Sequence, residues 1–385
     1  MLFTTFAFLL VGLTTASIAY YLVCIFAAMK FFSEARRCCD GKLPPATILI
    51  PLCGTDFEAY ENHASFCRQT YPSFQIVFGV HDGNDASVPV VRKLMADFPD
   101  RDIELVISPE AIGENPKVNN LHNMLVRAKH EVIILVDSDI RVGPDCLAVI
   151  VPQLSDEGVG LVTCFYRAGK ALNGASALES VGITGEFAPG VLVAWLTEGM
   201  SFALGALIAT TRKKLRSIGG FEAIADYLAD DFMLGNLMHK AGYEVRLSPY
   251  VVETLQPPMR FWSMLKHQIR WARGIRACRP LGHLGSLVTH GTALAVLCVI
   301  ANQASTPSLL LLAATLIARL TMGWVVGAHF LRDVNLGKNL WLLPIRDLLS
   351  FALWCVSLFG KEVEWRGQLF KIVGDGKITP VQRGL

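Results

Sequence analysis

The chain has 385 residues, of which 52% are hydrophobic and 18% are charged, and its mean hydropathy is +0.42. This composition is too apolar for an ordinary soluble protein and too charged for membrane helices alone, so it indicates one soluble domain with several membrane segments. The formal net charge of +2 excludes a strongly basic protein whose main partner is nucleic acid.

Residues 1–30 are predicted to form an N-terminal transmembrane anchor. The stretch 2–29 has no charged side chain and is long enough to cross a hydrocarbon core of about 30 Å. A cleaved signal peptide is the alternative, but the stretch lacks a basic start and exceeds the apolar region of such peptides. Lys30, Arg36, Arg37 and Lys42 follow, so the positive-inside rule places the next domain in the cytoplasm.

Residues 40–260 are predicted to form an α/β domain with a Rossmann-like sheet. Predicted strands and helices alternate, with strands at 47–52, 75–80, 103–107 and 132–136 and helices at 57–69, 87–97 and 117–129. This alternation indicates βαβ units and a parallel sheet, which binds ligands beyond the carboxyl ends of its strands. No GxGxxG sequence accompanies these strands, which disfavours a nicotinamide or flavin dinucleotide as the ligand.

Acidic residues follow two of the predicted strands. Asp82 and Asp85 come after the second strand, and Asp137-Ser138-Asp139 comes after the fourth. Two carboxylates at this spacing can bind one hard cation that keeps sites free for phosphate oxygens, so Asp137 and Asp139 are candidate ligands of Mg²⁺ or Mn²⁺. Such a cation would neutralise a diphosphate leaving group. Surface loops also contain DxD sequences, but the position after an apolar strand favours the metal site.

A second acidic pair, Asp230-Asp231, stands before an expected helix that begins near Phe232. One interpretation is stabilisation of the free amides at a helix N-terminus. The other is that one carboxylate acts as a general base, removing the proton of an attacking hydroxyl. The sequence leaves both open.

A basic amphipathic segment is predicted over residues 261–283. Arg270, Arg273 and Arg276 fall on one face of a helix there. That face suits an anionic membrane surface, and it equally allows Arg270 to contact a diphosphate while the other two arginines bind lipid headgroups.

The C-terminal membrane segments are predicted over residues 284–360. The apolar runs 284–300 and 308–330 are the two expected spans. The run 341–359 is interrupted by Pro344, Arg346 and Asp347, which suits a re-entrant or interfacial segment. In that case the tail 361–385 is cytoplasmic, whereas a full crossing by the run 341–359 would place the tail outside.

Taken in order, these elements resemble the D, D, D, (Q/R)xxRW pattern of processive and lipid-directed inverting glycosyltransferases, and the whole chain resembles the ceramide glucosyltransferase family. Residues 51–56 (PLCGTD) stand where that family has a PLKGxD-like loop, and residues 113–121 (GENPKVNNL) are similar to its GxNPKxNNL segment. The resemblance spans residues 40–280. It implies an A-type nucleotide-sugar glycosyltransferase fold with flanking transmembrane helices.

The resemblance also implies a role for each matching residue. On the donor side, Asp82 and Asp85 would contact the nucleotide, Lys117 and Asn119 would lie near the donor, and Asp137 and Asp139 would bind the metal and the diphosphate. Asp231 would be the general base, and Arg270 and Trp271 would close over the donor diphosphate and the acceptor. One residue departs from the pattern, because His267 stands where the family has Gln or Arg. Which side chain makes that polar contact is therefore open, since Gln268 is one place away. Glu179 and His81 are interpreted as structural.

The expected activity is hexose transfer from a UDP-sugar such as UDP-glucose to the hydroxyl of a membrane lipid, ceramide by resemblance. Bacterial hopanoid glycosyltransferases share this layout, so a hopanoid polyol that accepts N-acetylglucosamine or another sugar is an alternative. A processive polysaccharide synthase shares the aspartates but needs more membrane helices for a channel. The expected location is a bacterial inner membrane, with a multi-pass chain whose catalytic domain is cytoplasmic.

Overall fold

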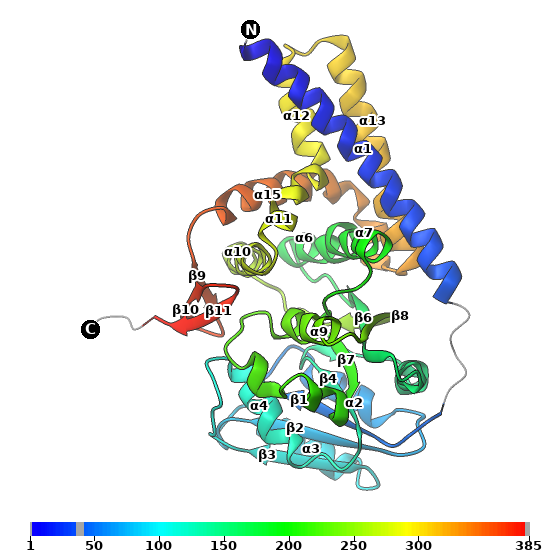
Figure 1. Cartoon of the computed structure of the whole chain (residues 1–385), viewed down its shortest axis with the longest axis vertical. Coiled ribbons are helices and arrows are strands. Elements are labelled where there is room, and N and C mark those ends of the chain that lie inside the picture. Colours follow the sequence, from blue (N-terminus) through cyan, green and yellow to red (C-terminus); the bar gives the residue numbers. More distant parts are fainter. Residues whose placement is uncertain (1, 36–41, 382–385) are drawn as a thin grey trace. The chain divides into compact units, whose positions relative to one another are not determined.

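The computed structural model describes residues 2–35 and 42–381, which fall into two compact units (Figure 1). The sheet unit takes its residues from Ala35–Gly169, Glu198–Pro257 and Gly376–Leu385. The helical unit takes its residues from Met1–Glu34, Lys170–Thr197 and Pro258–Asp375. Arg36 and Arg37, which entered the prediction of membrane orientation, lie outside the described residues, as do residues 382–385 of the predicted tail.

An eight-stranded mixed sheet forms the centre of the sheet unit, with the order β3-β2-β1-β4-β7-β6-β8-β5. Its strands are β1 (Ala46–Pro51), β2 (Phe74–Val80), β3 (Asp102–Ile107), β4 (Val132–Val136), β5 (Ile140–Arg141), β6 (Val159–Ala168), β7 (Leu207–Thr211) and β8 (Glu244–Thr254). β1 to β4 are parallel to one another, as predicted. β7 runs antiparallel to both β4 and β6, so the second half of the sheet departs from the parallel pattern.

Helices connect the strands of the sheet unit. They are α2 (Ala59–Cys67), α3 (Val88–Asp97), α4 (Pro116–Leu125), α5 (Cys146–Ile150), η1 (Val151–Ser155), α8 (Arg212–Ser217), η3 (Phe221–Ile224) and α9 (Asp230–Lys240), and a short strand, β11 (Lys377–Pro380), completes the unit. Every residue of β1, β2 and β4 is buried. Strands buried on both faces read as continuous apolar runs, which is why the sequence located them closely.

The chain reverses its direction of winding between β1 and β4. β2 and β3 lie on one side of β1, and β4 lies on the other. In open α/β sheets this reversal leaves a crevice beyond the carboxyl ends of the two strands, where ligands bind. The loops that follow Pro51 and Val136 therefore have the position expected of a binding site.

The helical unit contains α1 (Leu2–Ala35), α6 (Gly174–Gly182), η2 (Ile183–Phe187), α7 (Ala188–Glu198), α10 (Phe261–Cys278), α11 (Pro280–Gly285), η4 (Ser286–Thr289), α12 (Gly291–Ala301), α13 (Thr306–Gly323), η5 (Trp324–Phe330), α14 (Val334–Lys338), η6 (Leu340–Leu342), α15 (Leu343–Ser357), β9 (Glu362–Trp365) and β10 (Gln368–Val373). Ala7 and Leu10 of α1 pack on Leu294 and Cys298 of α12, beside α13 in Figure 1. β9 and β10 form an antiparallel hairpin.

Four helical segments of the described chain are long and apolar enough to cross a membrane: Thr5–Glu34, Gly174–Glu198, Thr306–Phe330 and Leu340–Ser357. The predicted span 284–300 is instead part of two helices, Pro280–Thr289 and Gly291–Ala301, bent by 62°. Gly174–Glu198 was not predicted as a membrane segment. All of it except its last residue belongs to the helical unit, which differs from the uninterrupted domain predicted over 40–260.

Ion pairs explain why charged residues occur within these apolar helices. Nη2 of Arg319 lies 2.7 Å from Oδ1 of Asp347, with side chains 2% and 3% exposed. Nε of Arg346 lies 3.0 Å from Oε2 of Glu186. Pairing removes much of the cost of placing a charge in an apolar environment. The interruption at residues 344–347 therefore does not prevent Leu340–Ser357 from being a candidate span.

Candidate active site

The DSD tripeptide is fixed at the carboxyl end of β4 by backbone hydrogen bonds. The N–H of Asp137 donates to the carbonyl of Ala206 over 3.2 Å, and the carbonyl of Asp139 accepts from the N–H of Leu255 over 2.9 Å. The hydroxyl of Ser138 donates to a carboxylate oxygen of Asp56. The two predicted metal ligands are thus held at the β1–β4 crevice by the residue before β7, by the residue after β8 and by the loop after β1.

Lys117 enters this crevice from the N-terminus of α4. Its backbone N–H donates over 2.9 Å to Oδ1 of Asn115, the helix cap, and the Asn115 side chain in turn donates over 2.7 Å to the carbonyl of Tyr227. The Lys117 ammonium lies 2.6 Å from Oδ1 of Asp137 and 3.2 Å from Oδ2 of Asp230. Burial alone would lower the pKa of Lys117, but the carboxylates of Asp137 and Asp230 raise it above its usual value. Lys117 is therefore a permanent cation.

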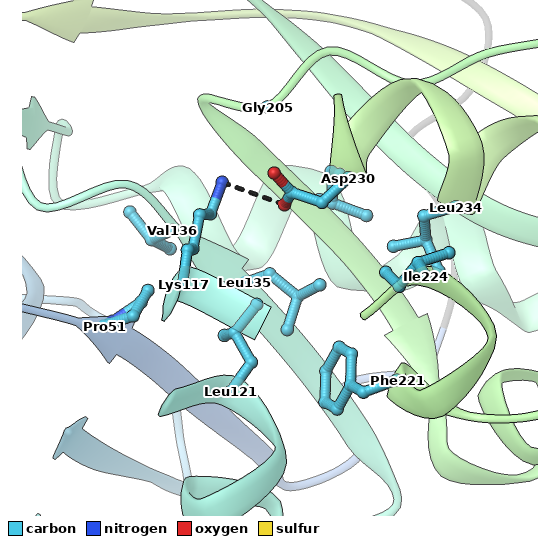
Figure 2. A pocket seen from close by; sticks show the side chains of 11 residues that line it. Pro51, Lys117, Leu121, Leu135, Val136, Gly205, Phe221, Ile224, Asp230 and Leu234 are labelled. Carbon is cyan, nitrogen blue, oxygen red and sulfur yellow. Dashed lines mark ion pairs between the residues drawn. The ribbon is translucent and has the colours of Figure 1, made fainter. Parts of the chain in front are cut away.

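Figure 2 shows a small pocket around the pair of Lys117 and Asp230. The rest of its lining is mainly apolar, contributed by Pro51, Leu121, Leu135, Val136, Gly205, Ile208, Phe221, Ile224 and Leu234. Low polarity around an ion pair strengthens its electrostatic attraction. The pocket therefore supports the position of Lys117 and offers few polar groups to a ligand.

Asp231 lies in the first turn of α9. Burial is the main cause that raises the pKa of Asp231 to about 6, and the charge of Asp230 adds to it, while Lys117 acts in the opposite direction. A Cβ atom placed on Gly205 would lie 2.8 Å from Oδ2 of Asp231, so the glycine leaves room for this carboxylate. A carboxylate with a pKa near 6 is ionised at neutral pH yet more basic than a solvated one, which suits a general base.

Asp139 has the surroundings of a cation ligand. Burial raises the pKa of Asp139 to about 6, and the nearby charge of Asp137 raises it further, against a hydrogen bond of 2.7 Å that Thr254 donates to Oδ2. Oδ1 of Asp139 accepts no hydrogen bond from the described residues. A divalent cation between Asp137 and Asp139 would relieve this concentration of negative charge, so the two residues fit the predicted metal.

A cation there would need ligands from outside the described chain. Among residues 2–35 and 42–381, no three His, Cys, Asp or Glu side chains are close enough together to hold a metal ion. Mg²⁺ and Mn²⁺ commonly take one or two carboxylates and complete their coordination with phosphate oxygens and water. The pair of Asp137 and Asp139 matches that arrangement.

Three predicted donor-binding residues mainly organise backbone, Asp82 and Asp85 from the loop after β2 and Asn119 from the first turns of α4. Asp85 accepts from the N–H of Gly54 over 2.8 Å and from the hydroxyl of Ser87 over 2.6 Å, which joins the loops after β1 and β2. Asn119 accepts from the N–H of Gly113 over 3.1 Å. Asp82 is exposed and accepts from the N–H of its neighbour Asn84 over 3.0 Å. Asp82 is the most exposed of the three residues.

The structure thus brings Lys117, Asp137 and Asp231 together around Asp230, with Asp139 beside Asp137. Asp230 was named in the acidic pair but was not chosen as a site residue, and Asp56 was missed except as part of the PLCGTD sequence. In the sequence, the position of Asp230 next to Asp231 and the presence of Asp56 in the family-like PLCGTD loop could have identified these two residues.

Arg270 and Trp271 belong to the helical unit, on α10. The Arg270 guanidinium lies over the ring of Trp365 in β9, 5.9 Å from its centroid. Nη1 of Arg273 donates to the carbonyl of Glu362 over 2.5 Å, and Nη2 of Arg276 donates to that of Gly360 over 2.5 Å. Arg273 and Arg276 therefore hold the segment before and within the hairpin, a use that the sequence did not reveal.

The sequence matches the model of glycosyl transferase family 21 over residues 7–378. Two relatives are ceramide glucosyltransferases 1 and 3 of Caenorhabditis elegans. This chain is 26% identical to the first relative, over 61% of this chain and 50% of that relative. It is 25% identical to the second relative, over 89% of this chain and 75% of that relative. The chain thus spans about half the length of the first relative.

A solved structure shares the fold. It is a mannosyltransferase from Pyrobaculum calidifontis, in complex with GDP-Man and Mn²⁺, with 19% identity and a TM-score of 0.50 over 90% of this chain and 97% of that chain. The likeness confirms the predicted α/β fold of A-type glycosyltransferases. Because the family match extends over almost the whole chain, this protein belongs to glycosyl transferase family 21.

Proposed function

We propose that the protein transfers a hexose from a UDP-sugar to a hydroxyl of a membrane lipid, with ceramide as the first acceptor to test. The observation that carries the proposal is the cluster of Lys117, Asp137, Asp230 and Asp231 at the β1–β4 crevice. The names of the C. elegans relatives support ceramide as acceptor and glucose as sugar.

The donor would lie at the carboxyl ends of β1 and β4. Asp82 supplies an accessible carboxylate for nucleotide hydroxyls, while Asp85 and Asn119 shape the loops around it. Lys117 supplies positive charge next to Asp137, which favours the developing negative charge of a leaving diphosphate. As the family resemblance implies, Arg270 and Trp271 would contact the diphosphate and the acceptor.

Asp137 and Asp139 would hold Mg²⁺ or Mn²⁺. When bound, such an ion neutralises negative charge on the diphosphate. The mannosyltransferase of similar fold contains both GDP-Man and Mn²⁺, which supports a nucleotide sugar and a divalent cation here. Removal of the ion by EDTA should abolish transfer, and added Mg²⁺ or Mn²⁺ should restore it.

Asp231 would take the proton of the acceptor hydroxyl as its oxygen attacks C1 of the sugar. The C1–O bond to the diphosphate breaks as the new bond forms, so a single in-line displacement inverts the anomeric carbon. A positioned base of this kind contributes on the order of 10²–10⁴ in rate. The apolar helices of the helical unit support an acceptor drawn from the bilayer and a chain embedded in a membrane; we place the catalytic domain on the cytoplasmic side of a bacterial inner membrane.

The test is mass spectrometry of lipids from a heterologous host that expresses the full chain and receives ceramide or, in parallel, a hopanoid polyol. A monohexosyl ceramide that is absent with Asp231→Ala is the expected product. A glycosylated hopanoid would change the acceptor, and a ladder of polymer products would indicate a processive synthase. Asp231→Ala should leave affinity for UDP nearly unchanged; loss of both would reassign Asp231 to a structural or metal role.

A further inference from the structure

A buried carboxylate of the helical unit contacts the helix that carries Arg270 and Trp271. Glu179 lies in α6, and its side chain is 0% exposed. Its Oε1 lies 2.8 Å from Nδ1 of His267, and its Oε2 accepts a hydrogen bond of 2.7 Å from Nε2 of Gln268. A buried carboxylate is costly unless its oxygens are hydrogen-bonded. Two adjacent side chains of α10 meet that requirement.

In the neutral form of His267, the contact with Glu179 fixes the tautomer of the ring. A carboxylate oxygen accepts hydrogen bonds, so Nδ1 of His267 carries the hydrogen, and Nε2 is the acceptor nitrogen of the neutral ring. Nε2 has no donor among the residues that the structure describes, and the His267 side chain is 29% exposed. The ring therefore presents one oriented, accessible acceptor nitrogen.

Gln268 is not available for the same purpose, because both ends of its amide are engaged. Its Nε2 donates to Glu179, and its Oε1 accepts from Nη2 of Arg346 over 2.5 Å. Arg346 is held in turn by Glu186, 3.0 Å away. Of the two neighbouring side chains, His267 is thus the one with an accessible polar atom, which favours it over Gln268 for the polar contact that the sequence left open.

The same ring contacts Trp271. The ring centroids of His267 and Trp271 lie 4.9 Å apart in an edge-on arrangement. The ring centroid of Phe187, at the end of η2, lies 6.1 Å from that of Trp271. Edge-to-face aromatic pairs restrict the orientation of both rings. Fixing the imidazole through Glu179 therefore also constrains Trp271.

We propose that Glu179 is a positioning residue, which holds His267 so that Nε2 accepts a hydrogen bond from a hydroxyl of the lipid acceptor. This inference rests on the proposed function, because it requires a hydroxyl-bearing acceptor. A hydroxyl is the matching group, since it donates one hydrogen bond and carries no charge. If residue 179 served only to pack α6 against α10, an apolar side chain would suffice there.

The test uses the purified full chain in detergent with UDP-glucose and a short-chain ceramide, and measures KM for each substrate together with kcat. Glu179→Ala should raise KM for the ceramide on the order of ten-fold, because the ring loses its orienting partner, while KM for UDP-glucose stays unchanged. Glu179→Gln keeps one acceptor oxygen and should fall between Glu179→Ala and the wild type.

Two substitutions at His267 separate orientation from packing. The side-chain amide of His267→Asn reaches the position of Nδ1, so it keeps the contact with Glu179 and removes Nε2; we expect a ceramide KM as high as in Glu179→Ala, with an unchanged melting temperature. The amide oxygen of His267→Gln reaches the position of Nε2 and should recover part of the lost affinity. Trp262→Ala changes a side chain of the same helix that is 73% exposed and leaves both hydrogen bonds of Glu179 intact, so it is the matched control and should stay within about two-fold of wild type.

A His267→Asn variant with wild-type KM for ceramide would overturn the inference, because it would show that the contact with Glu179 only holds the helix. That comparison remains decisive if Glu179→Ala does not fold, since Glu179 is intact in both His267 variants. A wild-type chain that forms no glycolipid would instead overturn the proposed function, and the inference with it. Normal wild-type transfer with no acceptor effect in His267→Asn overturns the inference alone.

Discussion

The ammonium nitrogen of Lys117 lies 2.6 Å from Oδ1 of Asp137, which joins the N-terminus of α4 to the carboxyl end of β4. The same nitrogen lies 3.2 Å from Asp230. One cation therefore balances two carboxylates far apart in the sequence, one in the loop after β4 and one at the N-terminus of α9. Its removal should affect both the stability of the sheet unit and the chemistry at the crevice.

Lys117→Met should lower the stability of the sheet unit by about 2 kcal/mol, because it leaves two carboxylates close together without a counter-charge. Breaking a fully buried pair costs more, about 3–5 kcal/mol, but the Asp137 side chain is 37% exposed and solvent screens part of the effect. The expected fall in apparent melting temperature is roughly 4–8 °C, measured by differential scanning fluorimetry in detergent.

Lys129→Met is the matched control for this prediction. Lys129 pairs with Asp102 over 2.7 Å in the same unit, but the two side chains are 55% and 41% exposed. Exposed pairs contribute about 0–1 kcal/mol, so its melting temperature should change little. Equal falls in melting temperature for the two variants would mean that the Lys117 ion pair stabilises the fold no more than an exposed ion pair does.

Asp231→Asn should abolish transfer and yet stabilise the folded chain above pH 6. The pKa of Asp231 is raised to about 6, mainly by burial and then by Asp230, against about 3.9 in an unfolded chain. The folded state therefore holds a proton that the unfolded state loses between these values, and wild-type stability falls as pH rises from about 4 to 6.

The free energy of unfolding that Asp231→Asn gains over wild type should be absent below pH 4, grow between pH 4 and 6, and reach about 3 kcal/mol above pH 6. Melting temperatures of wild type and variant across this range measure it. A variant that is less stable than wild type at pH 7.5 would show that ionised Asp231 contributes favourable contacts to the fold.

The rate of transfer should fall on the acid side of pH 6 for the same reason. A base must be ionised to accept a proton, so kcat/KM should decrease about ten-fold for each pH unit below the pKa of Asp231. Lys117 lowers this pKa, so Lys117→Met should move the midpoint to higher pH. A profile measured with saturating Mn²⁺ that stays flat down to pH 5 would argue against Asp231 as the base.

Gly205→Ala should reduce kcat more than ten-fold and leave KM for the UDP-sugar unchanged. The added methyl group would lie 2.8 Å from Oδ2 of Asp231, so the carboxylate has to move, and small displacements of a reacting group have large effects on rate. Gly174→Ala is the control, because its Cβ would meet no atom within 4 Å. Full activity in Gly205→Ala would indicate that the position of Asp231 is not critical.

The sequence predicted the first half of the sheet well because β1, β2 and β4 are buried on both faces and appear as apolar runs. It did not reveal Gly174–Glu198 as a membrane candidate, since Glu179 and Glu186 interrupt the hydropathy of that segment. Their partners His267, Gln268 and Arg346 are distant in sequence. Likewise, the sequence showed the DxD and Asp230-Asp231 motifs. It did not show that Lys117 forms ion pairs with both motifs, because those contacts depend on how α4 meets β4.

The arrangement of α10 and the hairpin has the same long-range origin. Lys266, Arg270 and Arg273 are spaced at i, i+4 and i+7, so they share one face of α10. They contact β9 through Glu364 at 2.7 Å, the ring of Trp365 and the carbonyl of Glu362. The hairpin thus restrains the arginine of the RW motif.

Trp365→Ala should therefore lower kcat/KM for the UDP-sugar by about two- to five-fold, which corresponds to the roughly 0.5–1 kcal/mol of an exposed cation–π contact. Trp365→Phe keeps an aromatic face and should lose less. Trp262→Ala tests whether loss of any tryptophan of this region would give the same effect, because Trp262 lies in the first turn of α10 but is 73% exposed. We expect no change in kcat/KM for this variant. If Trp365→Ala matches wild type while Arg270→Ala is inactive, Arg270 reaches its functional position without the hairpin.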